Sequence, residues 1–225
     1  MTPSLALGQV VHEVVESLST LPISDRLKQP LSARFEIAWN LLPSRVKSDD
    51  IKDRGLAMLS RIEANPGIVL QKAVKIRQDL PYYWLSEDDN IILCGKIDWL
   101  SYNEADDSVS IVDFKTGKFD EDPESLQLPI YLLLAQNCQP RRVAGAYYWY
   151  LDRDNVPKEV SLPNPQEALE KLLPLAKKVA LARKLQHFPC PQKDGCRACL
   201  GLEKIYRGEA ELVGSNSFGQ DVFMV

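Results

Sequence analysis

The N-terminal part of the chain repeats apolar residues at intervals of three and four, which is the period of an amphipathic helix. The pattern is clearest over residues 7–18, where the apolar positions are Leu7, Val10, Val11, Val14, Val15 and Leu18. Residues 24–40 and 44–64 show a similar pattern on either side of Pro43, and Asn65-Pro66-Gly67 ends the block. We therefore expect residues 1–66 to form an N-terminal helical region.

From Ile68 onward the pattern changes to short runs rich in β-branched and aromatic residues, separated by polar turns. These runs predict a meander of antiparallel strands over residues 68–76, 82–85, 91–102 and 108–114. The pattern then predicts a helix, two strands and a long amphipathic helix over residues 124–138, 142–151, 156–162 and 166–186. This order of elements favours an α/β sandwich with a mixed sheet.

Composition narrows the class of protein. The chain has 225 residues, of which 45% are hydrophobic and 26% charged, as is typical of a soluble globular protein. A net charge of −4 argues against non-specific duplex binding by the whole molecule, but a local basic groove is compatible with it. No apolar run reaches the roughly 18 residues that cross a bilayer, and the N-terminus lacks the basic start of a signal peptide. We expect a cytoplasmic protein without membrane contact.

Acidic and basic side chains meet in two of the predicted strands. Asp98 lies in the run 91–102, whereas Asp113 and Lys115 stand two residues apart in the next run and so share a strand face. Two carboxylates suit a hard cation such as Mg²⁺, and a lysine beside them suits stabilisation of an anionic transition state. Phosphodiester hydrolysis needs this combination. The alternative for an isolated Asp-x-Lys is a surface ion pair.

Three more polar residues are candidates for the same site. Gln127 and Tyr131 stand four apart on a predicted helix and share one of its faces. They either hydrogen-bond a phosphate or the lysine, or they simply lie at the boundary between helix and sheet. His12 lies on the first predicted helix and is a competent ligand for ions such as Mn²⁺, although a single histidine is more often an ordinary core or surface residue.

Five motifs follow one another in a recognisable order. They are Gly8-x-x-x-His12, Gly95-x-Ile97-Asp98, Asp113-x-Lys115, Thr116-Gly117 and Gln127-x-x-x-Tyr131. Their order resembles the RecB-type branch of the PD-(D/E)XK nucleases over about residues 7–135. The resemblance implies a restriction-endonuclease-like core with a central mixed β-sheet flanked by helices. It divides the chain into the helical region of residues 1–66, a catalytic core of residues 67–187 and a cysteine-bearing tail of residues 188–225.

The resemblance also implies an activity and roles for single residues. The activity is that of a metal-dependent DNA exonuclease or endonuclease, using Mg²⁺ or Mn²⁺ and working beside a helicase subunit in repair or recombination. Lys115 would be the catalytic lysine, supported by Gln127 and Tyr131. The implied metal ligands are His12, Asp98, Asp113 and the backbone carbonyl of Phe114. Family members often carry an acid in the preceding strand, but residues 69–78 contain none and have Lys72, Lys75 and Arg77 instead, which are candidates for phosphate contacts.

Three cysteines cluster near the C-terminus. Cys196-x-x-Cys199 is a half-site for zinc or an iron–sulfur cluster, and Cys190 is a third candidate ligand. Nucleases of the AddB and CRISPR-adaptation types are similar in having a C-terminal cysteine trio, which there joins an upstream cysteine around a [4Fe–4S] cluster. No cysteine precedes His12 in this chain, and the trio is spaced differently. A four-cysteine cluster is therefore incomplete within this chain: either the start is truncated, a partner donates a ligand, or the site is zinc or degenerate.

Two surfaces are candidates for DNA contacts. Basic residues that either line a DNA path or belong to solvated faces are Arg141, Arg142, Lys177, Lys178, Arg183, Lys184, Lys193 and Arg197. Strand alternation places Tyr148 and Tyr150 on one face and Tyr147 and Trp149 on the other, so one pair is core and the other is free to stack on bases. The leading hypothesis is a metal-dependent DNA nuclease, and the rival is a non-catalytic DNA-binding or scaffolding module of a helicase–nuclease complex.

Overall fold

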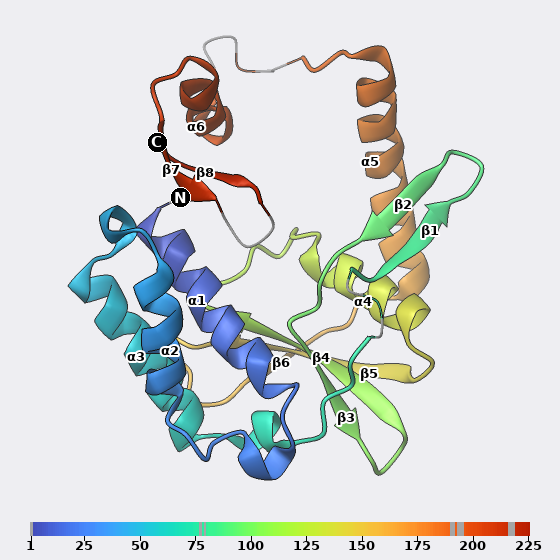
Figure 1. The fold of residues 1–225 in the computed structure, drawn as a ribbon. Coiled ribbons are helices and arrows are strands. Elements are labelled where there is room, and N and C mark those ends of the chain that lie inside the picture. Colours follow the sequence, from blue (N-terminus) through green and yellow to red (C-terminus); the bar gives the residue numbers. More distant parts are fainter. Residues whose placement is uncertain (1, 77, 79, 190–191, 193–195, 216–218) are drawn as a thin grey trace.

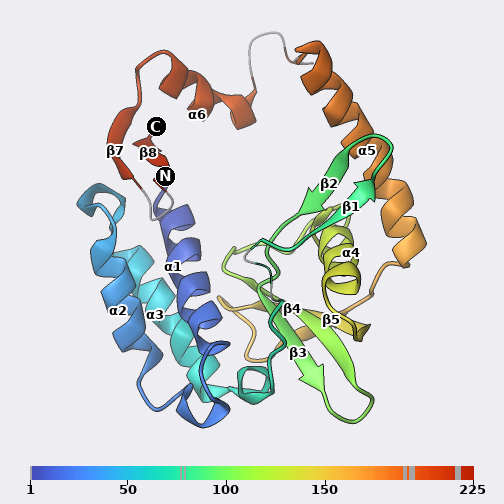
Figure 2. The same cartoon turned by 45° about the vertical axis from the view of Figure 1, so that its right-hand side comes forward.

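Helices enclose a central sheet in this computed structural model, which describes residues 2–76, 78, 80–189, 192, 196–215 and 219–225. One layer contains α1 (Pro3–Leu18), α2 (Leu31–Leu41) and α3 (Asp49–Ala64), and the opposite side of the sheet carries α4 (Gln127–Cys138) and α5 (Pro165–Leu185) (Figures 1 and 2). Short 3₁₀ turns occupy Ile23–Asp25, Ser44–Val46 and Gly67–Leu70. None of the described helices is long and apolar enough to cross a membrane.

The central sheet contains four strands in the order β3-β4-β5-β6. These are β3 (Trp99–Asn103), β4 (Ser108–Lys115), β5 (Arg142–Tyr150) and β6 (Lys158–Val160). β4 runs antiparallel to β3 and parallel to β5, and α4 makes the crossover that a parallel pair requires. β6 returns antiparallel to β5. The expected mixed α/β sheet flanked by helices, with N-terminal helices, is confirmed.

The N-terminal helices pack on one face of this sheet. The apolar stripe of α1 is buried from Leu7 to Leu18 and joins a core that includes Phe114 of β4 and Trp149 of β5. Gly55 allows α3 to come close, because a Cβ there would lie 2.6 Å from the side chains of both Leu7 and Phe35. The result is a helical layer fixed directly against the strand that carries Asp113.

α4 covers the opposite face. Leu128 and Leu132 of this helix pack on Val109 and Ile111 of β4. A separate two-stranded sheet, formed by β1 (Tyr82–Ser86) and β2 (Ile91–Cys94), packs with α5 on the outer side of α4. The tail contains α6 (Arg197–Tyr206) and a hairpin of β7 (Glu211–Ser215) and β8 (Asp221–Met224).

Three expectations about local structure are wrong. Residues 68–76 form a 3₁₀ turn and an irregular segment that touches β3 through one bridge, Ala73 to Ser101. Buried Arg26 donates hydrogen bonds to the carbonyls of Val69 (2.5 Å) and Gln71 (2.7 Å), which a strand would have used in a ladder. The expected strand 91–102 is divided, because residues 95–98 belong to neither β2 nor β3, and α4 begins at Gln127 rather than at residue 124.

Candidate active site

The C-terminal end of β4 carries an aspartate and a lysine on the face toward α4. The Lys115 ammonium lies 2.9 Å from Asp113 Oδ2, and the two side chains are 14% and 3% exposed, respectively. The pair is therefore buried, unlike the surface ion pair considered above. Tyr148 of β5 lies beside Asp113 in the sheet, and its ring centroid is 5.0 Å from the Lys115 ammonium. Trp149 points to the opposite face and is fully buried there.

Asp98 and His12 approach β4 from two other elements. Asp98 Oδ2 accepts a hydrogen bond from the Phe114 N–H (3.1 Å) and lies 3.3 Å from His12 Nδ1. His12 reaches this position because α1 passes close to the end of β4, where a Cβ on Gly8 would be only 3.2 Å from Thr116 Oγ1. A side-chain carboxylate thus meets a backbone N–H of β4, and β3 begins one residue later, at Trp99.

The first turn of α4 completes the surroundings of the lysine. Gln127 Oε1 accepts a short hydrogen bond from Lys115, and Gln127 Nε2 donates to Tyr131 OH (3.0 Å). The two contacts fix the orientation of the amide, because its oxygen faces the ammonium and its nitrogen faces the phenol. Burial raises the pKa of Tyr131, so its hydroxyl stays protonated.

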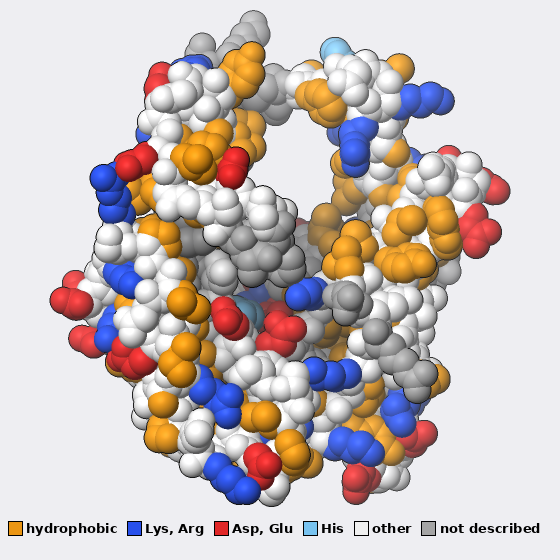
Figure 3. All heavy atoms as spheres, in the orientation of Figure 1, with side chains coloured by type: hydrophobic (Ala, Val, Ile, Leu, Met, Phe, Trp, Pro, Cys, Tyr) orange, Lys and Arg blue, Asp and Glu red, His pale blue; other side chains and the backbone are white. Residues whose placement is uncertain are grey.

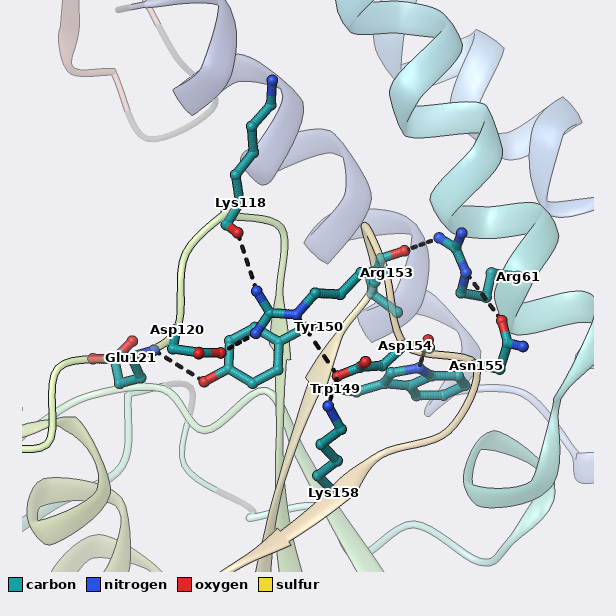
Figure 4. A network of polar contacts seen from close by, with 11 residues as sticks. Arg61, Lys118, Asp120, Glu121, Trp149, Tyr150, Arg153, Asp154, Asn155 and Lys158 are labelled. Atoms are coloured by element: carbon teal, nitrogen blue, oxygen red, sulfur yellow. Dashed lines mark hydrogen bonds and ion pairs between the residues drawn. The ribbon is translucent and has the colours of Figure 1, made fainter.

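Glu121 is a residue of this site that sequence reasoning missed. Its carboxylate lies 2.6 Å from the Lys115 ammonium, so two carboxylates flank one lysine. The loop that carries it is fastened to β5 and the following turn, as Figure 4 shows. The Glu121 N–H donates to Tyr150 OH (2.9 Å), and Arg153 donates to the Lys118 carbonyl (3.1 Å) and pairs with Asp120. The only sequence signal was an acidic loop, in which no single acid stands out.

The electrostatics of the site favour an added cation. Burial, and then the neighbouring charge of Asp98, raise the pKa of Asp113 from 3.8 to about 6, although Lys115 opposes the shift. The buried Asp113 Oδ2 accepts no hydrogen bond from any described residue. Lys115 lies only 2.9 Å away, but its ammonium is not oriented to donate a hydrogen bond to this oxygen. Burial lowers the pKa of His12, but the contact with Asp98 outweighs it and the net shift is upward. Figure 3 shows a histidine and acidic side chains gathered in a hollow of the front face.

The structure brings seven predicted residues into one neighbourhood, namely His12, Asp98, Asp113, Phe114, Lys115, Gln127 and Tyr131. Among the described residues, however, no three His, Cys, Asp or Glu side chains are arranged to hold a metal ion. The candidate ligands are instead paired with one another or with Lys115.

The cysteine tail gives no support for zinc or an iron–sulfur cluster. Cys190 lies outside the described residues. Cys196 immediately precedes α6 and Cys199 lies in its first turn. No metal-holding group that includes either of them is found in the described ranges. The described residues therefore do not support the expected cluster or zinc site.

Comparisons with known proteins give one result at the level of family. A search of curated proteins finds no match. The family model described as the PD-(D/E)XK nuclease superfamily matches residues 1–200, which include every element that contributes to the site. Asp98, Asp113 and Lys115 all lie within the matched range. The chain belongs to the PD-(D/E)XK nuclease superfamily.

Proposed function

We propose that this protein is a metal-dependent deoxyribonuclease that hydrolyses phosphodiester bonds of DNA, acting as an exonuclease in repair or recombination. The observation that carries the proposal is the burial of Asp113 between a second carboxylate and a lysine, with a pKa raised to about 6. Burying two carboxylates beside each other costs free energy, and carboxylates with such strongly raised pKa values are found most often at functional sites. A purely structural role does not require them. The RecB-type resemblance suggests a helicase subunit as partner.

The residues present suit Mg²⁺ or Mn²⁺ in their chemistry. Carboxylate and carbonyl oxygens and a neutral imidazole are ligands for such ions. An ion near Asp113 would offset the repulsion from Asp98 that raises its pKa. His12, Asp98, Asp113 and the Phe114 carbonyl would hold the ion. When bound, it would lower the pKa of water and polarise a phosphoryl oxygen.

In this proposal Lys115 neutralises negative charge on the phosphate of the substrate. Its ammonium is held by Asp113, Glu121 and Gln127, so it is fixed before the substrate arrives. A preorganised cation stabilises the negative charge that develops on a phosphate in the transition state. The neighbouring carboxylates raise the pKa of Lys115 more than burial lowers it, which keeps it charged. Gln127 and Tyr131 act through Lys115 and are positioning residues.

The test is degradation of end-labelled linear single- and double-stranded DNA with Mg²⁺, Mn²⁺ or EDTA. Asp113→Ala and Lys115→Ala are assayed beside the parent, with Lys28→Ala as a matched control because Lys28 is exposed and paired with Asp25. We expect metal-dependent cleavage that falls at least ~100-fold in the two site variants and persists in the control. Release of short products from the ends identifies an exonuclease.

Two results would count against the proposal. Cleavage by both site variants at the rate of the parent would show that the site is wrongly identified. Absence of cleavage by folded parent protein with every metal would favour the rival, a non-catalytic DNA-binding or scaffolding module. The ion pairs that occupy Lys115 are the feature that makes this rival worth testing.

A further inference from the structure

A basic cleft lies at the far end of α4 from the candidate active site. It has a volume of about 680 Å³, and its lining includes Lys72, Lys75, Tyr102 and Arg141 but no acidic residue among those described. α4 begins at Gln127, beside the catalytic lysine, and its last residue lines the cleft. The mechanism proposed above uses none of these cleft residues.

An aromatic ring holds two of the cations in place. The Lys72 ammonium and the Arg141 guanidinium each lie 4.9 Å from the ring centroid of Tyr102. The negative face of the ring attracts both groups, which would otherwise repel each other. Arg141 is also paired with Asp107 (2.9 Å), whereas in the described residues no carboxylate lies within 4.0 Å of the ammonium of Lys72 or Lys75. Asp107 offsets part of this charge, since its carboxylate also feels the charge of Lys72, but the three cations leave the described part of the cleft with a net positive charge.

The cleft leads toward the active site. The segment that carries Lys72 and Lys75 runs beside β3, because the Tyr102 N–H donates to the Lys72 carbonyl and the Val74 N–H donates to the Leu100 carbonyl (2.8 Å each). Going from Lys72 to Lys75 thus follows β3 backward, toward Asp98. Four residues at about 3.3 Å each separate Tyr102 from Asp98, or about 13 Å. Measured along the axis of a duplex, at about 3.4 Å per nucleotide of one strand, this distance corresponds to about four nucleotide steps. Figure 3 shows basic side chains on the front face below the acidic hollow.

We infer that this cleft binds phosphate groups of the DNA strand that is being cleaved, a few nucleotides from the scissile phosphate. The inference rests on the proposed function, which supplies DNA as the ligand. Lysine and arginine contacts to phosphates release counterions and fix the register of the strand without reading its sequence. The acidic hollow repels DNA when no metal is bound, so a cationic anchor outside it supplies affinity that the active site alone lacks.

The test is DNA binding by full-length protein in an Asp113→Ala background, which prevents cleavage. Fluorescence anisotropy with a labelled 30-nucleotide single strand and its duplex measures affinity between 50 and 300 mM salt. The Lys72→Glu/Lys75→Glu variant should bind at least ~10-fold more weakly and lower the salt slope by about 1.4–1.8, since each phosphate contact contributes about 0.7–0.9. The matched control, Lys28→Glu/Lys204→Glu, replaces two exposed lysines that are assigned to no DNA contact, changes net charge equally and should bind within threefold of the background.

Each outcome decides the inference. An unchanged affinity in the cleft variant, or an equal loss in the control variant, overturns it, because the second result reflects net charge alone. Circular dichroism of every variant excludes unfolding as the cause of a loss. Binding is measured without turnover, so a parent that fails to cleave DNA would refute the proposed function and leave this comparison valid.

Discussion

Replacing Asp113 with asparagine should stabilise the metal-free protein. Asp113 is 2% exposed, and its pKa is about 6 instead of 3.8 because burial and Asp98 disfavour the charged form. A pKa raised in the folded state means that the stability contributed by the protonated group is fully present below about pH 3.8 and is lost as the pH rises through about 6. Asparagine does not ionise, so the variant should keep this stability at every pH.

The size of the effect follows from linkage. A shift of about 2 units costs the parent about 3 kcal/mol at pH 8, but less than about 1 kcal/mol at pH 4, where the carboxyl is mostly protonated in the folded state. For a protein of this size, about 3 kcal/mol corresponds to roughly 6–12 °C in Tm. The Asp113→Asn variant should therefore be more stable than the parent at pH 8, nearly equal at pH 4, and inactive.

Urea unfolding in EDTA at pH 4, 6 and 8 measures this difference directly. Asp88→Asn is the matched control, because Asp88 is exposed in the turn between β1 and β2. It should change the free energy of unfolding little at any pH. A variant of Asp113 that gains nothing at pH 8, or gains as much at pH 4 as at pH 8, would refute the idea that the parent holds a buried, ionised carboxylate at a cost.

Three more perturbations test other parts of the structure. Mg²⁺ or Mn²⁺ should raise the Tm of the parent, since a ligand that binds only the folded state stabilises it, and equal shifts in Asp113→Asn would mean that the ion binds elsewhere. Lys115→Ala should slow single-turnover DNA cleavage by roughly 100–1,000-fold, and a rate equal to that of the parent would remove it from the mechanism. Gly55→Ala should lose about 1–3 kcal/mol in urea unfolding, because its Cβ would lie 2.6 Å from Phe35 Cζ, whereas Gly67→Ala has nothing within 4 Å and should lose little; similar losses would contradict this reasoning.

Periodic patterns predicted most of the fold. α1 and α3 appear where apolar residues recur at helical spacing, and the run 108–114 became β4 almost unchanged. The same geometry brought the predicted site residues together: the spacing of two in a strand placed Asp113 and Lys115 on one face, and the spacing of four in a helix paired Gln127 with Tyr131. Local periodicity is sufficient where both partners lie on the same element.

What escaped prediction depends on partners distant in sequence. Arg26 donates hydrogen bonds to the carbonyls of residues 69 and 71. These carbonyls are then not available to a sheet, so the strand predicted over residues 68–76 does not form. Asp98 meets the Phe114 N–H of β4 with its side chain and not with its backbone, and β3 begins only after it, at Trp99. Glu121 reaches Lys115 only because Tyr150 and neighbouring groups hold its loop. Such contacts have no signature in a single sequence.

The segment that carries Lys72 also has a consequence for self-association. It lies along the outer edge of β3, where it makes one bridge, Ala73 to Ser101, and the opposite edge strand, β6, has only three residues. An open sheet edge is a template for pairing with another chain, and lysines, short edge strands and covering segments all oppose such pairing. We expect apolar replacements of Lys72 and Lys75 to promote aggregation, whereas glutamate keeps the edge charged. The lysines proposed to contact DNA would thus also keep the sheet from extending into that of a second copy.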